Sequence, residues 1–222
     1  MSACLRKRAP ASRAGSIVVA DRPNILAEIR KPGIGLAIWD RSIDPVLHRW
    51  LDQRPAGKLP SGRILAALPD LEAAMATLFP DSKAAADSAW LGLAADIREL
   101  TLWYSLIAET PVIDIRLEEI THDACWRYHR DNVRLRLVTT YLGPGTEIVP
   151  AAHAEQALAH QREYEGPRNA LARGAVALFK GDQARGNAIV HRSPPIRQRG
   201  IRRLFLSLNA PSTASPNLWS KP

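Results

Sequence analysis

The sequence is poor in cysteine, with only Cys4 and Cys125 among its 222 residues. Two cysteines do not make a disulfide framework, and we expect no bond between them because Cys4 lies in a predicted N-terminal tail. A reducing cytoplasm is therefore the expected compartment. No run of apolar residues approaches the roughly 18 that a membrane-spanning helix needs, so no membrane partner is expected.

The N-terminal segment also lacks the features of a secretory signal. Its first 13 residues contain no acidic side chain and no apolar stretch. Arginine and serine also occur in organellar targeting segments, but we favour a disordered basic tail over residues 1–16. No internal repeat or low-complexity linker follows, and the length suggests one domain or one domain with an extension.

Acidic residues are in the minority, with 22 Asp and Glu against 30 Lys and Arg and a net charge of +8. This balance is compatible with nucleic-acid binding. The basic residues are spread along the chain, however, and no basic helix or aromatic–basic module is present. A solvated basic surface, or an anionic small substrate or cosubstrate, is favoured over nucleic acid.

The first half of the chain is predicted to be mixed and mainly helical. Residues 34–39 form a short apolar run that predicts a buried strand. Apolar residues at helical spacing predict helices over 44–53, 68–78 and 84–107. We expect residues 17–110 to form a segment that packs on the rest of the chain.

From Val112 onward the hydrophobic period changes to two, which predicts strands with one buried face. Further strands are predicted over 174–179, 187–191 and 201–208. Many short strands separated by Gly- and Pro-containing turns are typical of a sandwich, jelly roll or barrel. The chain is therefore predicted to be α+β, with N-terminal helices buttressing a C-terminal β structure over 111–212 and a tail over 213–222.

The tripeptide His129-Arg130-Asp131 and the distant His191 have the pattern of a metal site with two histidines and one carboxylate. Two neutral imidazoles and one carboxylate hold Fe(II) on one face and leave positions open for oxygen chemistry. If residues 129–141 form one strand, alternate residues point the same way. His129 and Asp131 would then share a face with an apolar row. That row consists of Val133, Leu135, Leu137, Thr139 and Tyr141.

Five phrases occur in a characteristic order over residues 112–210. They are His129-Arg-Asp131, Thr140-Tyr-Leu-Gly-Pro-Gly-Thr-Glu147, Gly174-Ala-Val-Ala-Leu-Phe179, His191 with Pro194-Pro195, and Gly200-Ile-Arg-Arg203 before Leu-Phe-Leu-Ser207. In this order they resemble the double-stranded β-helix (a cupin-like jelly roll) of the Fe(II)/2-oxoglutarate-dependent dioxygenase superfamily. The whole chain also resembles a bacterial domain family of unknown function, from which no activity is inherited.

The resemblance implies an oxygenase of the hydroxylase type, with His129, Asp131 and His191 as ligands of Fe(II) and 2-oxoglutarate as cosubstrate. The distal carboxylate of 2-oxoglutarate needs a cation, and the planar fork of arginine suits it. A strand over 201–208 would place Arg203 on one face with Ser207 as a second contact.

The sequence leaves other cosubstrate contacts open. The spacing from Gly200 indicates Arg202 instead of Arg203, and Arg199 is a third candidate. The hydroxyl of Tyr141 is a further candidate donor to the same carboxylate. The substrate, a small molecule or a protein, and the oligomeric state are not specified by the sequence.

Three alternatives accompany the oxygenase hypothesis. His122, Cys125 and His129, with Asp131, are potential zinc ligands, so a metal-binding cupin-like protein without oxygenase turnover is one, with zinc or iron bound. A metal-free binding scaffold is another. His-Arg-Asp also occurs in the protein-kinase catalytic loop, but the Leu and spaced Asn that follow it there are missing, and so is the Gly-rich loop. We therefore reject a kinase.

Overall fold

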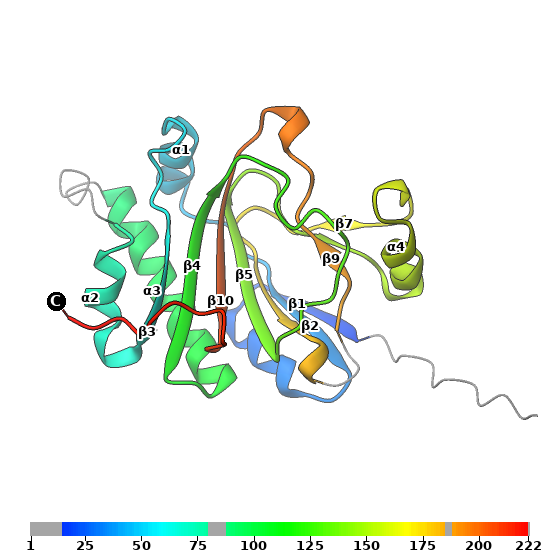
Figure 1. Ribbon diagram of the computed structural model, residues 1–222, viewed down its shortest axis with the longest axis horizontal. Helices are drawn as coiled ribbons and strands as arrows, with labels where there is room; N and C mark the ends of the chain where they lie inside the picture. Colours follow the sequence, from blue (N-terminus) through cyan, green and yellow to red (C-terminus); the bar gives the residue numbers. More distant parts are fainter. Residues whose placement is uncertain (1–14, 80–87, 185–187, 222) are drawn as a thin grey trace, which may run out of the picture.

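The computed structural model describes residues 15–79, 88–184 and 188–221. A seven-stranded sheet in the order β1-β2-β8-β5-β10-β4-β3 and a three-stranded sheet in the order β7-β6-β9 organise the molecule (Figure 1). The strands are β1 (Ser16–Ala20), β2 (Ile34–Trp39), β3 (Gly62–Ala67), β4 (Val112–Ile120), β5 (Leu135–Leu142), β6 (Glu147–Ile148), β7 (Asn169–Ala170), β8 (Val176–Lys180), β9 (His191–Arg192) and β10 (Arg203–Asn209).

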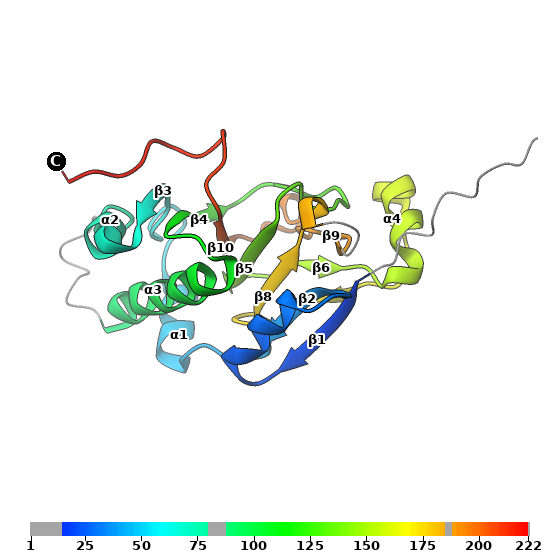
Figure 2. The ribbon, with the colours of Figure 1, turned by 90° about the horizontal axis from the view of Figure 1, so that it is seen from below.

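Helices cover one side of the large sheet, and α4 lies beside the small one (Figures 1 and 2). The α-helices are α1 (Pro45–Gln53), α2 (Leu71–Ala76), α3 (Ser88–Ala108) and α4 (Ala154–His160). Three of the 3-10 segments are η1 (Pro23–Arg30), η2 (Leu68–Asp70) and η7 (Arg197–Arg199). The structure is thus a mixed α and β architecture, as the sequence predicted. None of the described helices is both long and apolar enough to cross a membrane.

The large sheet is antiparallel except where β1 pairs with β2 in parallel. Successive side chains along each strand point to opposite faces of the sheet, and each face packs against a different cluster. On β4, Ile113, Ile115 and Leu117 are fully buried in the main core with the inner face of α3. On the opposite face, Val138, Ala177 and Phe179 pack with Ile148 of the small sheet and with Ile189. The prediction of one buried apolar row on β4 is therefore confirmed.

The N-terminal segment contributes strands as well as helices to the fold. Residues 1–14 of the predicted tail lie outside the described part, but Ser16 begins β1 and its N–H donates to the carbonyl of Gly33 at 2.7 Å. β1 and β2 extend one end of the large sheet, and β3 forms the other end. Residues 17–110 therefore supply strands of the large sheet and do not only pack on it. Backbone pairing with strands far along the chain decides which segments join a sheet.

The predicted helices occur with changed bounds. Asp44 caps α1 by accepting from the N–H of Val46 at 2.6 Å, so the helix proper begins at Pro45. The predicted helix over 68–78 divides into η2 and α2. Residues 84–87 of the long predicted helix lie outside the described part, and α3 is described from Ser88.

Two further expectations differ from the structure. The segment 129–141 is not one strand, because β5 begins only at Leu135 and His129 forms an isolated bridge. The predicted tail over 213–222 is in contact with the sheet. Leu218 bridges Leu65 in parallel, and the N–H of Trp219 donates to the carbonyl of Leu65 at 2.7 Å.

Candidate metal centre

Backbone pairing brings the two histidines of the motif together. The N–H of His129 donates to the carbonyl of His191 at 3.0 Å, and the N–H of His191 donates back at 3.1 Å. This isolated bridge continues the edge of the small sheet, since His191 opens β9. The centroids of the two rings are 4.6 Å apart. A ladder contact between distant segments therefore sets the spacing of the two imidazoles.

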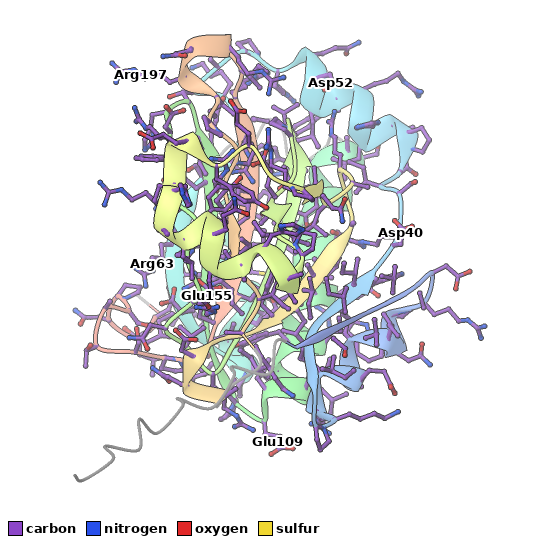
Figure 3. The ribbon with its side chains drawn as sticks, turned by 90° about the vertical axis from the view of Figure 1, so that its right-hand side faces the viewer. Asp40, Asp52, Arg63, Glu109, Glu155 and Arg197 are labelled. Atoms are coloured by element: carbon purple, nitrogen blue, oxygen red, sulfur yellow. The ribbon has the colours of Figure 1, made fainter. Side chains whose placement is uncertain are left out.

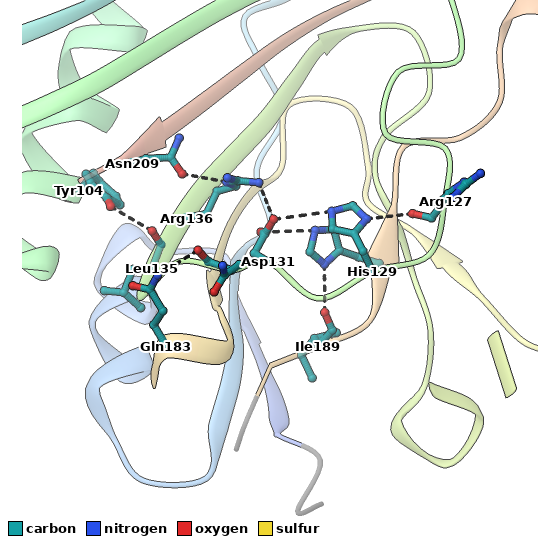
Figure 4. Close-up of polar contacts among 11 residues, drawn as sticks. Tyr104, Arg127, His129, Asp131, Leu135, Arg136, Gln183, Ile189 and Asn209 are labelled. Atoms are coloured by element: carbon teal, nitrogen blue, oxygen red, sulfur yellow. Dashed lines mark hydrogen bonds and ion pairs between the residues drawn. The ribbon is translucent and has the colours of Figure 1, made fainter. Parts of the chain in front are cut away.

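Asp131 completes the group from the loop that precedes β5. Its Oδ1 lies 3.6 Å from Nε2 of His129, and its Oδ2 lies 3.4 Å from Nε2 of His191 (Figure 4). The N–H of Asp182 donates to the carbonyl of Asp131 at 2.8 Å and holds the loop. One ligand atom from each residue lies within 4.8 Å of the others. Two metal–ligand bonds span at most about 4.2 Å, so the two carboxylate–imidazole separations suit a shared ion.

Both rings are held in the tautomer that metal binding needs. Nδ1 of His129 contacts the carbonyl of Arg127 at 2.8 Å, and Nδ1 of His191 contacts the carbonyl of Ile189 at 3.0 Å. A carbonyl oxygen only accepts, so each Nδ1 carries the proton that it donates. In the neutral ring each Nε2 then offers a lone pair on the side of Asp131.

The carboxylate of Asp131 is ionised in spite of its burial. Burial raises its pKa, but His129, His191 and Arg136 together lower the pKa well below its usual range. The neighbouring carboxylate of Asp131 in turn raises the pKa of His129. Oδ2 of Asp131 is buried and has no hydrogen-bond partner among the described residues. An unpartnered buried carboxylate oxygen facing two imidazole nitrogens is the donor set that a divalent cation satisfies.

The ligands open onto a cavity of about 150 Å³ on the face of the large sheet away from α3. His129 and His191 line one part of it. Other lining side chains come from the loops and from β5 and β10; these include Cys125, Val138, Thr146, Ser193, Phe205 and Ser207.

Arg203 is fully buried close to this cavity. Its Nε donates to the carbonyl of Pro144 at 2.8 Å, its Nη1 to Oγ of Ser193 at 2.8 Å, and its Nη2 to Oγ1 of Thr140 at 3.2 Å. No carboxylate of the described residues forms an ion pair with it, and burial lowers its pKa to about 10. Two of its neighbours, Ser193 and Phe205, line the cavity. A buried guanidinium without a carboxylate is prepared to receive an anion.

Arg202 lies elsewhere, although it adjoins Arg203 in the sequence. Its Nη1 donates to Oε1 of Glu119 at 2.9 Å and to the carbonyl of Pro55 at 3.1 Å, at the C-terminal end of α1. Arg199 is exposed in η7 and does not line the cavity. Ser207 therefore lines the cavity, and Arg203 is buried next to two residues that line it, whereas Arg202 and Arg199 are not among the lining residues.

Tyr141 is on the wrong face of the sheet for the predicted role. It is fully buried in the main core, and its hydroxyl donates to Oδ2 of Asp96 on α3 at 2.6 Å. Burial raises its pKa well above the ordinary value. The prediction that Asp131 shares a face with Tyr141 is wrong because residues 130–134 form a loop, which breaks the alternation before β5 begins.

His122 and Cys125 are not part of the cluster of potential ligands. Among the described residues, only His129, Asp131 and His191 form a group of three or more such side chains that could hold a metal ion. Cys125 lines the cavity, whereas the three-residue zinc set with His122 is not assembled.

The sequence-based prediction missed Arg136, which touches the centre directly. Its Nη1 pairs with Oδ1 of Asp131, and its Nε donates to Oδ1 of Asn209 at 2.8 Å (Figure 4). A single strand over 129–141 would place Arg136 on the face opposite to His129 and Asp131. Asp and Asn are residue types that favour turns. The pair Asp131-Asn132 is therefore the signal in the sequence that argues against one continuous strand over 129–141.

Comparison with known proteins finds a family and structural relatives. The family model described as "Protein of unknown function (DUF1826)" matches residues 20–209. No curated protein matches the sequence. Among solved structures, the dioxygenase for auxin oxidation 1 from Arabidopsis thaliana, in complex with 2-oxoglutarate, is 12% identical, and the match covers 91% of this chain and 95% of that one with a TM-score of 0.45.

Two further structures are similar to the same extent. A prolyl-4-hydroxylase from Pseudomonas putida is 12% identical over 88% of this chain and 94% of its own, with a TM-score of 0.41. A full-length protein from Neurospora crassa, in complex with alpha-KG, is 12% identical over 94% of this chain and 88% of its own, with a TM-score of 0.42. The structures that the chain resembles thus include proteins described as a dioxygenase and a hydroxylase. All three TM-scores lie below 0.5, so neither activity nor site residues follow from these matches.

Proposed function

The chain belongs to the DUF1826 family, a family described as of unknown function, and from its own site we propose that it is a non-haem Fe(II)/2-oxoglutarate-dependent oxygenase. The observation that carries the proposal is the cluster of His129, Asp131 and His191 with an unpartnered carboxylate oxygen. The buried Arg203 beside the same cavity is the second support.

The strand order supports a double-stranded β-helix over residues 111–212. Four neighbouring strands of the large sheet, β4-β10-β5-β8, form one side of it in this interpretation. The other side is β7-β6-β9, extended by the bridge between His191 and His129. Side chains of both sides meet in the cluster that contains Val138, Phe179 and Ile148. The segment 17–110 then supplies the additional strands β1, β2 and β3 and the covering helices.

In this proposal Nε2 of His129, Nε2 of His191 and a carboxylate oxygen of Asp131 hold the metal. Bound Fe(II) would supply oxygen activation coupled to decarboxylation of a 2-oxo acid, because three ligands on one face leave positions open. The carbonyls of Arg127 and Ile189 keep both rings oriented. The ring of Phe179 packs against the ring of His191, with 4.4 Å between the two ring centroids, and shields it on one side.

Arg203 has the role of anchoring the distal carboxylate of 2-oxoglutarate. Its hydrogen bonds to Pro144, Ser193 and Thr140 fix the guanidinium and leave its charge unpaired. A carboxylate that enters the cavity would neutralise this buried charge, which is why binding is favourable. Ser207 lines the cavity from the same strand and offers a hydroxyl to the same ligand.

The test is the spectrum of the reconstituted protein. Without oxygen, Fe(II) and 2-oxoglutarate together are expected to produce a weak visible absorption band, and oxygen is then expected to release succinate. Both signals are expected to vanish in His129→Ala. His160→Ala is the matched control, because His160 is exposed on α4 and is not part of the ligand group.

The same experiment separates the alternatives. Two imidazoles and a carboxylate also suit zinc, so tight stoichiometric zinc binding without a cosubstrate-dependent band would favour a metal-binding protein that has no oxygenase turnover. Absence of metal binding at micromolar concentration would eliminate both metal hypotheses and leave a metal-free scaffold.

A further inference from the structure

Three arginines line the same cavity as the metal ligands. They are Arg63 on β3, Arg116 on β4 and Arg136 on β5. Figure 3 looks at the molecule from the side of α4 and places Arg63 on the opposite side of the view from the surface acids Asp40 and Asp52. The cavity therefore has a cationic wall. Arg136 pairs with Asp131, whereas Arg63 and Arg116 have no part in the proposed oxygenase chemistry.

The strand register aligns two of these arginines in one row. Arg63 is directly opposite Arg116 between β3 and β4, and Arg116 is directly opposite Ser207 between β4 and β10. Ser207 is opposite Val138 on β5. All four residues line the cavity. The row thus runs from the edge strand β3 across β4 and β10 to β5.

Like charges directly opposite each other on neighbouring strands destabilise a sheet. Here acids offset part of that cost. Arg63 forms two hydrogen bonds with Asp114, of 2.9 and 2.6 Å, and Nη2 of Arg116 pairs with Glu118 at 2.7 Å. The hydrogen bonds with Asp114 raise the pKa of Arg63. The pairing restricts the orientation of both guanidinium groups.

Donors remain unused on both side chains. Within the described residues, Nη1 of Arg63 has no hydrogen-bond partner, and only Nη2 of Arg116 is engaged in an ion pair. Their side chains are 38% and 49% exposed, so a ligand can reach them. Glu118 is the single acid among the described residues that line the cavity. The wall therefore has more cationic donors than its own acids satisfy.

We propose that the row formed by Arg63 and Arg116 binds an anionic group of the substrate, a carboxylate or a phosphate, while the neighbouring part of the substrate faces the metal centre. This inference rests on the proposed oxygenase function. Arginine is suited to the task because its planar fork binds either anion through two hydrogen bonds. The cosubstrate and the substrate then use different arginines, since Arg203 is fully buried and the row is exposed.

The experiment uses four small aromatic probes on the full-length protein. Benzoate and phenyl phosphate carry the two anions, and benzamide and phenol are their neutral counterparts. Binding is measured by ligand-observed NMR with and without saturating Mn(II) and 2-oxoglutarate. We expect one or both anions to bind in both conditions and the neutral probes not to bind. Comparison of the two anions distinguishes a carboxylate-bearing substrate from a phosphate-bearing one.

Two variants and a control assign this binding to the row. Arg116→Gln is expected to lower the affinity for the anion by about tenfold or more, which is the loss that follows from removing a charge-assisted contact. Arg63→Lys keeps the charge beside buried Asp114 and loses the fork, so it tests the geometry without leaving a buried acid unpaired. Arg98→Gln is the matched control, because Arg98 pairs with Glu72 outside this cavity.

The outcomes separate this inference from the proposed function. Failure of both anions to bind at millimolar concentration, or equal binding to Arg116→Gln and the wild type, would overturn the inference. Anion binding that depends on Arg116 in a protein that binds neither metal nor 2-oxoglutarate would retain the anion site and reject the oxygenase. Metal and cosubstrate binding without any anion binding would retain the proposed oxygenase and reject the anion site.

Discussion

His129 and His191 exchange two backbone hydrogen bonds, of 3.0 and 3.1 Å, although 62 residues separate them in the sequence (191 − 129). The relative position of their rings is therefore set by the backbone of the small sheet and less by side-chain packing. A slip of one residue in this pairing would turn one ring to the other face. The candidate metal centre thus depends on the register between the segment before β5 and β9.

Removal of either imidazole is expected to abolish stable metal binding. His191→Ala takes away one of three ligand atoms and leaves the buried carboxylate of Asp131 with Arg136 as its main partner. We expect metal affinity to fall by more than about 100-fold, beyond the 10–100-fold loss typical of outer-sphere changes. Calorimetric titration with Co(II) or Fe(II) measures this. Unchanged affinity would place the metal elsewhere, and His160→Ala should bind like the wild type.

Arg203 and Arg202 are expected to differ sharply in their effect on cosubstrate binding. Arg203→Gln removes the buried charge beside the cavity, and 2-oxoglutarate affinity should fall by roughly 2–5 kcal/mol, as for other buried charge pairs that lose one partner. Metal affinity should change little. Arg202→Gln is the matched control, because Arg202 pairs with Glu119 and the end of α1. Titration of 2-oxoglutarate into metal-loaded protein compares the two, and a larger loss in Arg202→Gln would reverse the assignment.

Gly181 permits the loop of Asp131 to approach β8 closely. A Cβ at position 181 would overlap the carbonyl oxygens of Val133 and Asp131. Gly181→Ala should therefore push the ligand loop outward, lower the free energy of unfolding by roughly 1–3 kcal/mol, and weaken metal binding.

Gly92→Ala is the control for this change. Gly92 is exposed within α3, and a Cβ there would meet no atom within 4 Å. The free energy of unfolding should rise by about 0.5–1 kcal/mol because alanine favours the helix, with metal affinity unchanged. Chemical denaturation and metal titration of both variants test the pair. An undisturbed metal site in Gly181→Ala would show that the loop accommodates the methyl group.

Asp123 should make the stability of the protein pH-dependent. Its Oδ1 accepts from the N–H groups of Arg197 and Ile196, at 2.9 and 2.8 Å, and these hydrogen bonds lower the pKa of its carboxyl. A lowered pKa means that the ionised form stabilises the fold. That contribution is complete above the ordinary carboxyl pKa of about 3.9 and is lost as the pH falls through the lowered value.

The measurement is the difference in Tm between the wild type and Asp123→Ala as a function of pH. It should be largest near neutral pH and shrink at pH values below about 4. Asp21→Ala is the control, since Asp21 is 86% exposed and pairs only with its neighbour Arg22 among the described side chains. A difference that is constant over this pH range would mean that the charge of Asp123 contributes nothing.

Local periodicity was sufficient to predict much of this protein. Alternation on β4 separated Ile113, Ile115 and Leu117 from Asp114 and Arg116, and the structure buries the first set against α3. The same reasoning grouped Arg203 with Ser207 and away from Leu204. These predictions succeeded because the orientation of a side chain on a regular strand depends only on its position along that strand.

Tertiary structure alone decided what lies between regular elements and which elements pair. The loop over residues 130–134 puts Arg136 on the opposite face from the one that a continuous strand would give it, so Arg136 meets Asp131 and Tyr141 meets Asp96. The joining of β3 to β4, which aligns Arg63 with Arg116, also has no local signal. Such features depend on backbone hydrogen bonds between segments far apart in the chain, and the free energy of those contacts exists only once the whole sheet has formed.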